Sequence, residues 1–211
     1  DDGADDMLKY LREKQPTTEI ILHLTWAYEK NSDNVSFGLY LDDQERMHNE
    51  ITKAGTDYCA HAASLVTDSG LPVSLDGKPL RYIPAGIAFQ IARKNSMFNT
   101  ESDPNDRTAI TKSGNKFIDE TDNDMSKRTV VSGTSNFLDE KNYISLHRDS
   151  YHASFTWGRY LVALTWYGSL TGNSVLDVEY VPYSSGKISE RQRYLLNKAA
   201  EDAVDSVGIW R

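Results

Sequence analysis

The chain has 211 residues, of which 39% are hydrophobic and 26% are charged, and its formal net charge at pH 7 is -8. This length and composition indicate one folded domain with a substantial core, and the negative charge argues against nucleic acid or an anionic membrane as the main partner. No apolar run approaches the roughly 20 residues of a membrane-spanning helix. The single cysteine, Cys59, excludes an internal disulfide and a multi-cysteine metal site.

The amino-terminal part is predicted to place a helix before a buried strand. Met7–Lys14 follows an acidic run and reads as a helix, and the apolar run Ile20–Leu24 is typical of a strand in a parallel sheet. Turn residues then lead into a second helix from about Tyr40, which continues or is followed by another over Ala60–Val66. Cys59 falls in this helical stretch, so a buried thiol is expected. The expected inner stripe of the second helix is Met47, Ile51 and Ala54.

The next segment repeats the pattern of strand and helix. A hairpin-like turn is expected at Asp76-Gly77, and a strand that ends at Ile83 follows it. Pro84-Ala85-Gly86 then turns the chain into a helix whose inner residues are Ile87, Ile91 and Ala92. An alternation of helices and strands in this order predicts an α/β layered fold.

The region 97–145 differs from the rest because it is polar and weakly periodic. A structureless loop of that length is unusual inside a compact domain, so we interpret it as a polar insertion or lid with small strands at 129–131 and 137–138. A last helix is predicted over Ser189–Asp205, with its inner side formed by Leu195, Leu196, Ala199 and Val204. The chain is therefore predicted to be a single domain over residues 1–211.

Asp149 and His152 form the pattern with the clearest chemistry. They are spaced as Asp-x-x-His just before an aromatic-rich helix. An Asp three residues before a His can place its carboxylate at Nδ1 of the imidazole, which leaves Nε2 free to take a proton from a hydroxyl nucleophile. The same spacing also occurs in surface loops that only cap the helix that follows. The pair is therefore a candidate for the acid and base of a catalytic triad.

Five further residues are candidates for lining a substrate pocket. His23 stands at a predicted strand end, where ligands bind in open α/β sheets. Trp26 and Tyr28 follow it and could form a stacking wall for a carbohydrate, although a core histidine with packing aromatics fits the same pattern. Gln90 and Arg93 lie one helical turn apart, where they either bind substrate or brace the loop of the Asp-His pair. Bracing is the interpretation we favour.

A metal site is the alternative interpretation of the same loop. His147, Asp149 and His152 together read His-x-Asp-x-x-His, and zinc prefers three or four such ligands. A triad accounts better for the spacing and for the helix that follows, so neither a metal nor a cofactor is expected. The acid runs Asp1–Asp6 and Asp119–Asp124 lack the glycine and glutamate of a calcium loop and are interpreted as solvated surfaces.

Three stretches of the chain resemble the SGNH (GDSL-type) hydrolase superfamily, and most of all a branch catalogued only as a domain of unknown function and frequent in gut-type anaerobic bacteria. His23–Tyr28 resembles the end of that branch's central strand, and Ile83–Arg93 resembles its Ile-Pro-x-Gly turn from strand to helix. Arg148–Gly172 resembles its Arg-Asp-x-x-His block with the Gly-Arg-Tyr helix start. The resemblance implies a flavodoxin-like three-layer sandwich with a largely parallel sheet, in which Asp149 and His152 serve a serine nucleophile.

The chain departs from that superfamily at the nucleophile. The family's serine stands in a Gly-Asp-Ser-like turn after the first strand, and this block and the oxyanion-hole blocks are not in the sequence. The similar run Gly172-Asn173-Ser174 follows a helix end and lacks a preceding strand, so we do not assign it that role. The fold is therefore expected without its first βα unit, with the serine in a separate amino-terminal segment or chain.

The resemblance implies a serine esterase or acetylesterase that acts on a carbohydrate or a small acyl ester. A periplasmic or secreted location is the family's expectation. The alternative from another class is a catalytically silent module that keeps the fold and binds a glycan or a protein through its aromatic surface.

Overall fold

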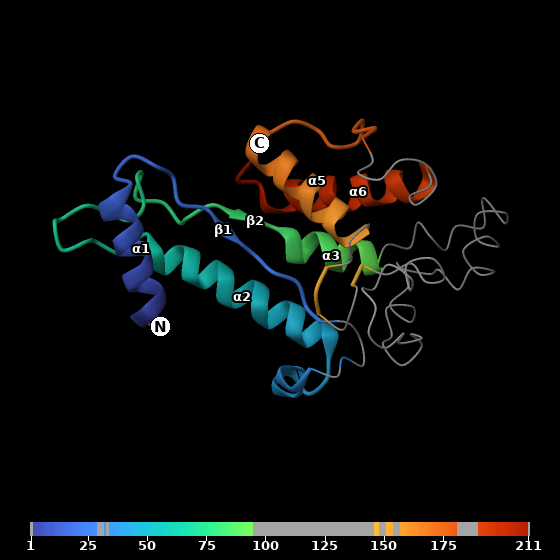
Figure 1. The fold of residues 1–211 in the computed structure, drawn as a ribbon, viewed down its shortest axis with the longest axis horizontal. Helices are drawn as coiled ribbons and strands as arrows, with labels where there is room; N and C mark the ends of the chain where they lie inside the picture. Colours follow the sequence, from blue (N-terminus) through green and yellow to red (C-terminus); the bar gives the residue numbers. More distant parts are fainter. Residues whose placement is uncertain are drawn as a thin grey trace, which may run out of the picture.

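The computed structural model describes residues 2–28, 32, 34–94, 146–147, 151–153, 157–180 and 190–210. The predicted insertion at 97–145, with its expected strands and acid run, lies outside these residues. Helices and two short strands alternate along the described chain, as Figure 1 shows. The elements are α1 (Asp2–Lys14), β1 (Leu22–His23), the 3-10 helix η1 (Val35–Tyr40), α2 (Gln44–Ala62), β2 (Tyr82–Ile83), α3 (Ala85–Lys94), α5 (Trp157–Thr171) and α6 (Glu190–Val207).

β1 and β2 form a parallel two-stranded sheet with helices on both faces. Leu22 lies opposite Tyr82 and His23 lies opposite Ile83. Successive side chains of a strand point to opposite faces, so Leu22 packs against the cluster of α1 and α2, whereas the neighbouring Ile21 packs against Ile83 and α6. Figure 1 shows α2 on one side of the strands and α5 with α6 on the other. The predicted α/β class and parallel pairing are confirmed.

The largest core cluster joins α3, α5 and α6. Ala88 and Phe89 of α3 pack with Leu161 of α5 and with the inner side of α6. Each large apolar side chain buried in this way contributes about 1.5–3 kcal/mol, so these three helices form the main body behind the sheet. The predicted inner side of the last helix is confirmed, because the following residues are buried: Leu195, Leu196, Ala199 and Val204.

A second, smaller cluster holds α1 against α2. Leu8 and Cys59 are buried in it, and burial raises the pKa of the Cys59 thiol to about 11. The helices are also linked at the surface, where Asp5 accepts a hydrogen bond from the Tyr58 hydroxyl at 3.0 Å and pairs with Nε2 of His61 at 2.9 Å. The prediction of a solvated acid run is therefore wrong at Asp5, because its carboxylate is engaged by α2.

Arg12 is buried at the carboxyl end of α1, and it fixes the turn that leads into β1. Its guanidinium donates to the carbonyl oxygens of Gln15, Pro16 and Thr18. The same group reaches across the domain and donates from Nε and Nη2 to the Val73 carbonyl, at 3.1 and 2.6 Å. The entry of the chain into the sheet is thus set by one buried cation that binds backbone dipoles.

The start of α2 differs from the expected start near Tyr40. Leu41 and Asp42 both have a φ of 57°, in the left-handed region, and this backbone ends η1 before α2 begins. The Asp43 side chain then caps α2 by accepting from the Arg46 backbone N–H at 2.9 Å. Ala54 is exposed, not inward as predicted.

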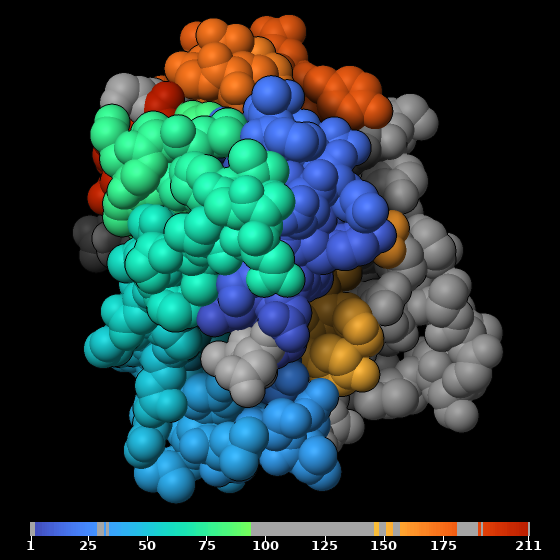
Figure 2. All heavy atoms as spheres, turned by 90° about the vertical axis from the view of Figure 1, so that its left-hand side faces the viewer, coloured from blue at the N-terminus to red at the C-terminus, as the bar shows by residue number. Residues whose placement is uncertain are grey.

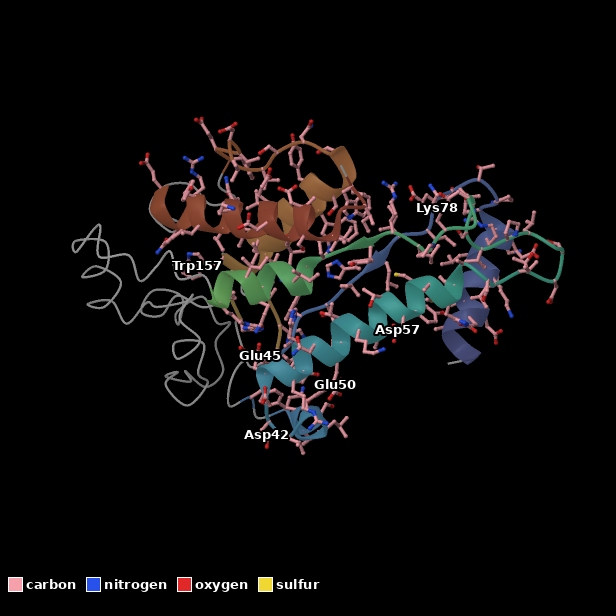
Figure 3. The ribbon with its side chains drawn as sticks, turned by 180° about the vertical axis from the view of Figure 1, so that it is seen from behind. Asp42, Glu45, Glu50, Asp57, Lys78 and Trp157 are labelled. Atoms are coloured by element: carbon pink, nitrogen blue, oxygen red, sulfur yellow. The ribbon has the colours of Figure 1, made fainter. Side chains whose placement is uncertain are left out.

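The outer side of α2 is charged. Glu45, Glu50 and Asp57 are exposed and lie along its length in Figure 3.

In the part of the chain that the structure describes, no helix combines the length and apolarity needed to cross a membrane.

Candidate functional site

The candidate site lies where β1 and β2 end and α3 begins. The Gly86 backbone N–H donates to the Leu24 carbonyl at 3.0 Å, which joins the exit of β1 to the first turn of α3. A Cβ at Gly86 would overlap the Thr25 carbonyl oxygen, so only glycine permits this close approach. The Ile-Pro-x-Gly turn of residues 83–86 therefore holds the carboxyl ends of the two strands together.

Arg93 fastens a loop from the second half of the chain to this edge. Its Nη2 donates to the Ala27 carbonyl at 2.7 Å and contacts Nε2 of His147 at 2.9 Å, and Nη1 donates to Oε1 of Gln90 at 3.3 Å. Arg93 and His147 are 1% and 2% exposed. A guanidinium can only donate, so Nε2 of His147 is the acceptor and its ring carries the proton on Nδ1.

This hydrogen bond weakens the zinc interpretation of His147, because the nitrogen that would bind a metal is occupied by Arg93. Among the described residues, no group of three His, Cys, Asp or Glu side chains is placed to hold a metal ion. The bracing role favoured for Gln90 and Arg93 fits this geometry, since both side chains are buried beneath the loop.

Trp26 holds the same loop at its exposed side. Its indole Nε1 donates to the Tyr151 carbonyl at 2.8 Å, and its ring stacks on Phe89 of α3 with centroids 4.5 Å apart. Tyr28 continues the aromatic row and lies 5.5 Å from the Tyr151 ring. The predicted stacking residues Trp26 and Tyr28 are thus both in contact with the segment that carries His152.

The loop is closed on itself before α5 begins. His147 and Ala153 form an antiparallel bridge. Gly158 lies so close to the Leu146 carbonyl that a Cβ there would overlap it. Trp157, 2% exposed and labelled in Figure 3, buries the first turn of α5. The described residues 151–153 are therefore held beside the strand edge.

His152 is exposed on this loop, and its ring lies 4.1 Å from that of Tyr151. Asp149 lies outside the described residues. The assignment of Asp149 and His152 as an acid–base pair stays a prediction.

His23 is positioned by α5, which the sequence did not indicate. Its Nδ1 accepts a hydrogen bond from the Trp166 indole at 3.0 Å, and its ring also makes an edge contact with Trp26. An accepting Nδ1 places the proton on Nε2. Burial lowers the pKa of His23 below its ordinary value, because desolvation disfavours the charged ring. The structure therefore brings the rings of His23 and Trp26 into contact, and their role in substrate binding stays a prediction.

Two other features lie away from this loop. Gly172-Asn173-Ser174 follows the end of α5, and Gly172 has a φ of 69°, typical of a helix-ending residue. A cavity of about 660 Å³ lies near the amino ends of the strands, where Ile20, Leu80 and Tyr82 line it. Ligands of open α/β sheets bind at the carboxyl ends, so the cavity is the weaker candidate.

No family model and no curated protein matches the chain. A solved structure, that of a DUF4886 family protein from Bacteroides uniformis, is similar to it, with a TM-score of 0.58 and 24% sequence identity. The match covers 95% of this chain and 54% of that one, so the chain spans about half the length of its structural neighbour. At this identity the likeness shows the fold alone. The shared fold agrees with the resemblance of the sequence to a branch catalogued as a domain of unknown function.

Proposed function

We propose that these residues form the histidine-bearing part of an SGNH-type ester hydrolase, a three-layer α/β sandwich whose serine is supplied by polypeptide outside residues 1–211. The observation that carries the proposal is the loop of His152, which is fastened to the carboxyl edge of a parallel sheet by Arg93 and Trp26 while His152 itself stays exposed.

The fastening supports a chemical role because catalysis needs a positioned base. A side chain on a loop that moves freely loses the orientation that proton transfer requires. Here a buried guanidinium and an indole each hold the loop to a different residue of the strand exit, Ala27 and Trp26. A loop that served only to start α5 would not need a buried cation beneath it.

In the proposed reaction, His152 takes the proton of the serine hydroxyl as the serine oxygen attacks the ester carbonyl. The proton is then given to the leaving alkoxide, and water releases the acyl group by the same steps in reverse order. Asp149 orients the imidazole. General base catalysis of this kind is worth about 10²–10⁴ in rate.

The aromatic row supports a carbohydrate ester as substrate. Trp26 and Tyr28 both contact Tyr151, through a hydrogen bond and a ring contact, and the Tyr151 ring lies beside that of His152. Flat aromatic surfaces of this kind suit the apolar faces of sugar rings. An acetyl group on such a sugar would then lie near the imidazole.

The test uses the full polypeptide that the gene encodes around these residues. We expect it to hydrolyse p-nitrophenyl acetate and to be labelled on a serine by a fluorophosphonate probe. His152→Gln should lower kcat/KM by about 10²–10⁴ without a change in melting temperature, whereas His61→Gln, on the far side of the domain, should leave kcat/KM unchanged. Unlabelled protein, or a turnover equal in wild type and His152→Gln, would overturn the proposal.

A glycan-binding module is the second candidate, and the same aromatic row favours it. In that case an acetylated xylo-oligosaccharide binds without being hydrolysed. Binding would be lost in Tyr151→Ala and kept in His152→Gln, which separates the two functions.

A further inference from the structure

A cavity of about 660 Å³ lies near the amino ends of β1 and β2, between α2 and the segment that joins α2 to β2. In Figure 2 the green part of this segment lies at the surface beside the blue amino-terminal part of the chain. Lys78, which lines the cavity, lies far from Trp157 at the start of α5 in Figure 3. The volume is within the range of about 300–1,000 Å³ that is usual for ligand pockets, and the cavity is separate from the candidate site.

The walls of the cavity are mainly aliphatic. They include Ile20, which precedes β1, Val73 and Leu80 from the segment after α2, and Ile209 beyond α6. The Leu80 backbone N–H donates to the Cys59 carbonyl at 3.0 Å and so fastens one wall to α2. Because burial of apolar surface is favourable, these walls suit a ligand with an aliphatic chain.

The guanidinium of Arg12 also lines the cavity, and Arg12 is only 1% exposed. Its hydrogen-bond acceptors among the described residues are all backbone carbonyls. Nη2 has two N–H groups but donates only to the Val73 carbonyl, at 2.6 Å. Within the part of the chain that the structure describes, Arg12 forms no ion pair and one N–H of Nη2 has no acceptor. A buried cation of this kind favours an anion as its partner.

The other charged side chains of the lining neutralise one another. Among the described lining residues, Glu19 is paired with Arg81 and Asp76 with Lys78. Arg12 is therefore the one cation among these described residues without a carboxylate partner, although the chain as a whole carries a formal net charge of -8. An anion that enters the cavity gains the attraction of Arg12, which the low dielectric of a buried site strengthens.

The Tyr82 hydroxyl is a second donor in the lining. Tyr82 accepts a hydrogen bond from the Trp210 indole through its backbone carbonyl, and its hydroxyl forms no hydrogen bond with any of the described residues. Burial, together with the nearby Cys59 thiol, raises the pKa of Tyr82, so the hydroxyl keeps its proton at neutral pH. A carboxylate accepts hydrogen bonds at both of its oxygens and matches two donors of this kind.

We propose that the cavity binds an aliphatic monocarboxylate, with the carboxylate at the Arg12 guanidinium and the Tyr82 hydroxyl and the chain against the aliphatic walls. A single negative charge matches the single unpaired cation of the described lining, whereas a phosphate group would bring a second charge that nothing in that lining neutralises. The site lies near the opposite ends of the strands from the loop of His152. It therefore does not rest on the proposed function.

Isothermal titration calorimetry of the full encoded polypeptide tests the proposal with octanoate, 1-octanol and acetate. Octanoate carries both the charge and the chain, so we expect it to bind at a single site at least about tenfold more tightly than either of the other two. A hydrogen-bonded charge pair and a buried chain each contribute a factor of that size. The proposal fails if octanoate does not bind, or if it binds no more tightly than 1-octanol.

Variants in the lining place the ligand. Ala60→Phe narrows the cavity from the exposed side of α2 and should weaken octanoate binding at least about tenfold. Ala54→Phe is the matched control, because Ala54 is exposed on the same helix but does not line the cavity, and it should leave binding unchanged. Tyr82→Phe removes one donor and should weaken binding about three- to tenfold. Affinities equal to wild type in both Ala60→Phe and Tyr82→Phe would reject the cavity as the octanoate site.

Arg12→Met should make the affinities for octanoate and 1-octanol equal. Because that variant is also expected to be less stable, its melting temperature is measured first, and Tyr82→Phe and Ala60→Phe decide the question if it does not fold. His152→Gln should bind octanoate as wild type does. Octanoate binding without a serine label would keep the carboxylate site and reject the hydrolase, and the reverse result would reject the carboxylate site alone.

Discussion

Two buried arginines at opposite ends of the sheet show how the same side chain serves different purposes. Arg12 and Arg93 are each 1% exposed. Arg12, before β1, donates to backbone carbonyls and fixes a turn. Arg93, beyond the carboxyl ends, donates to a carbonyl as well but also holds His147. The hydrogen bonds of Arg12 end on backbone carbonyls, whereas those of Arg93 also reach two side chains, Gln90 of α3 and His147 of the loop.

The difference between the two arginines indicates which end of the sheet carries the candidate functional site. A buried guanidinium is tolerated when carbonyl dipoles satisfy its donors, because an unsatisfied charge would be strongly destabilising. Arg12 meets that requirement with the carbonyls of Gln15, Pro16, Thr18 and Val73, whereas Arg93 combines the Ala27 carbonyl with the side chains of Gln90 and His147. Only at the carboxyl end does the cation also orient an imidazole, which is the kind of contact that positions a site.

Replacing either arginine should have the largest effect on the free energy of unfolding. Arg12→Met and Arg93→Met each leave buried carbonyl oxygens without their donors, so we expect a loss of about 3 kcal/mol in the free energy of unfolding, measured by urea denaturation. NMR of the histidine rings separates the two variants. Arg93→Met should shift the His152 ring signals, whereas Arg12→Met should leave them in place.

Lysine at the same positions is the control for charge. Arg12→Lys and Arg93→Lys keep the cation but not the planar fork, so they should recover part of the stability. If Arg12→Met moved the His152 signals as far as Arg93→Met does, the distinction between the two ends of the sheet would fail.

Gly158→Ala should have the second largest effect on stability. The added Cβ would overlap the Leu146 carbonyl, and overpacking of this kind costs about 1–3 kcal/mol. Gly38→Ala is a matched control because no atom lies within 4 Å of its added Cβ. Thermal unfolding of both variants measures the difference, and equal melting temperatures would show that the loop yields without cost.

Trp26→Phe tests the outer fastening of the loop. The variant keeps an aromatic ring on Phe89 but loses the indole donor to Tyr151, so a loss of about 1 kcal/mol is expected. Limited proteolysis near Tyr151 should become faster than in wild type. An unchanged rate would assign the hold on the loop to Arg93 alone.

His23 should give the smallest effect, visible only as a dependence on pH. Its pKa is lowered in the folded protein, so the stability it contributes is present above about pH 6.5 and is lost as the pH falls through that value toward the folded pKa. We expect less than about 1 kcal/mol, because solvent screens a half-exposed ring. His23→Phe should flatten this part of the curve of stability against pH from 7.5 to 5, and a curve parallel to wild type would contradict the assignment.

The local elements were largely predictable from the sequence. The pattern of apolar residues predicted the strand at Ile20–Leu24 and the inner side of α6. The spacing of apolar residues over a short window indicates which side chains of a strand or helix are buried. The start of α2 was not predictable in the same way. It depends on the left-handed pair Leu41 and Asp42 and on the cap at Asp43, and common residues reveal such turn geometry poorly.

The candidate site was predictable in its parts but not in its connections. The one-turn spacing of Gln90 and Arg93 was enough to suggest a brace. The contacts of Arg93 with His147 and of Trp166 with His23 join residues 54 and 143 positions apart, and no local pattern encodes them. The aromatic pair Trp166-Tyr167 in the last block was the available signal for a contact of α5 with the strand end.

The single buried cysteine gives the domain a built-in probe of its own opening. Cys59 of α2 is buried against α1, and with a pKa of about 11 it is almost wholly a thiol at neutral pH, a form that reacts slowly with disulfide reagents because the thiolate is the nucleophile. Its labelling rate therefore reports how often the amino-terminal layer separates from the sheet. Measured beside global unfolding, that rate distinguishes a domain that opens as one unit from one in which α1 and α2 detach first.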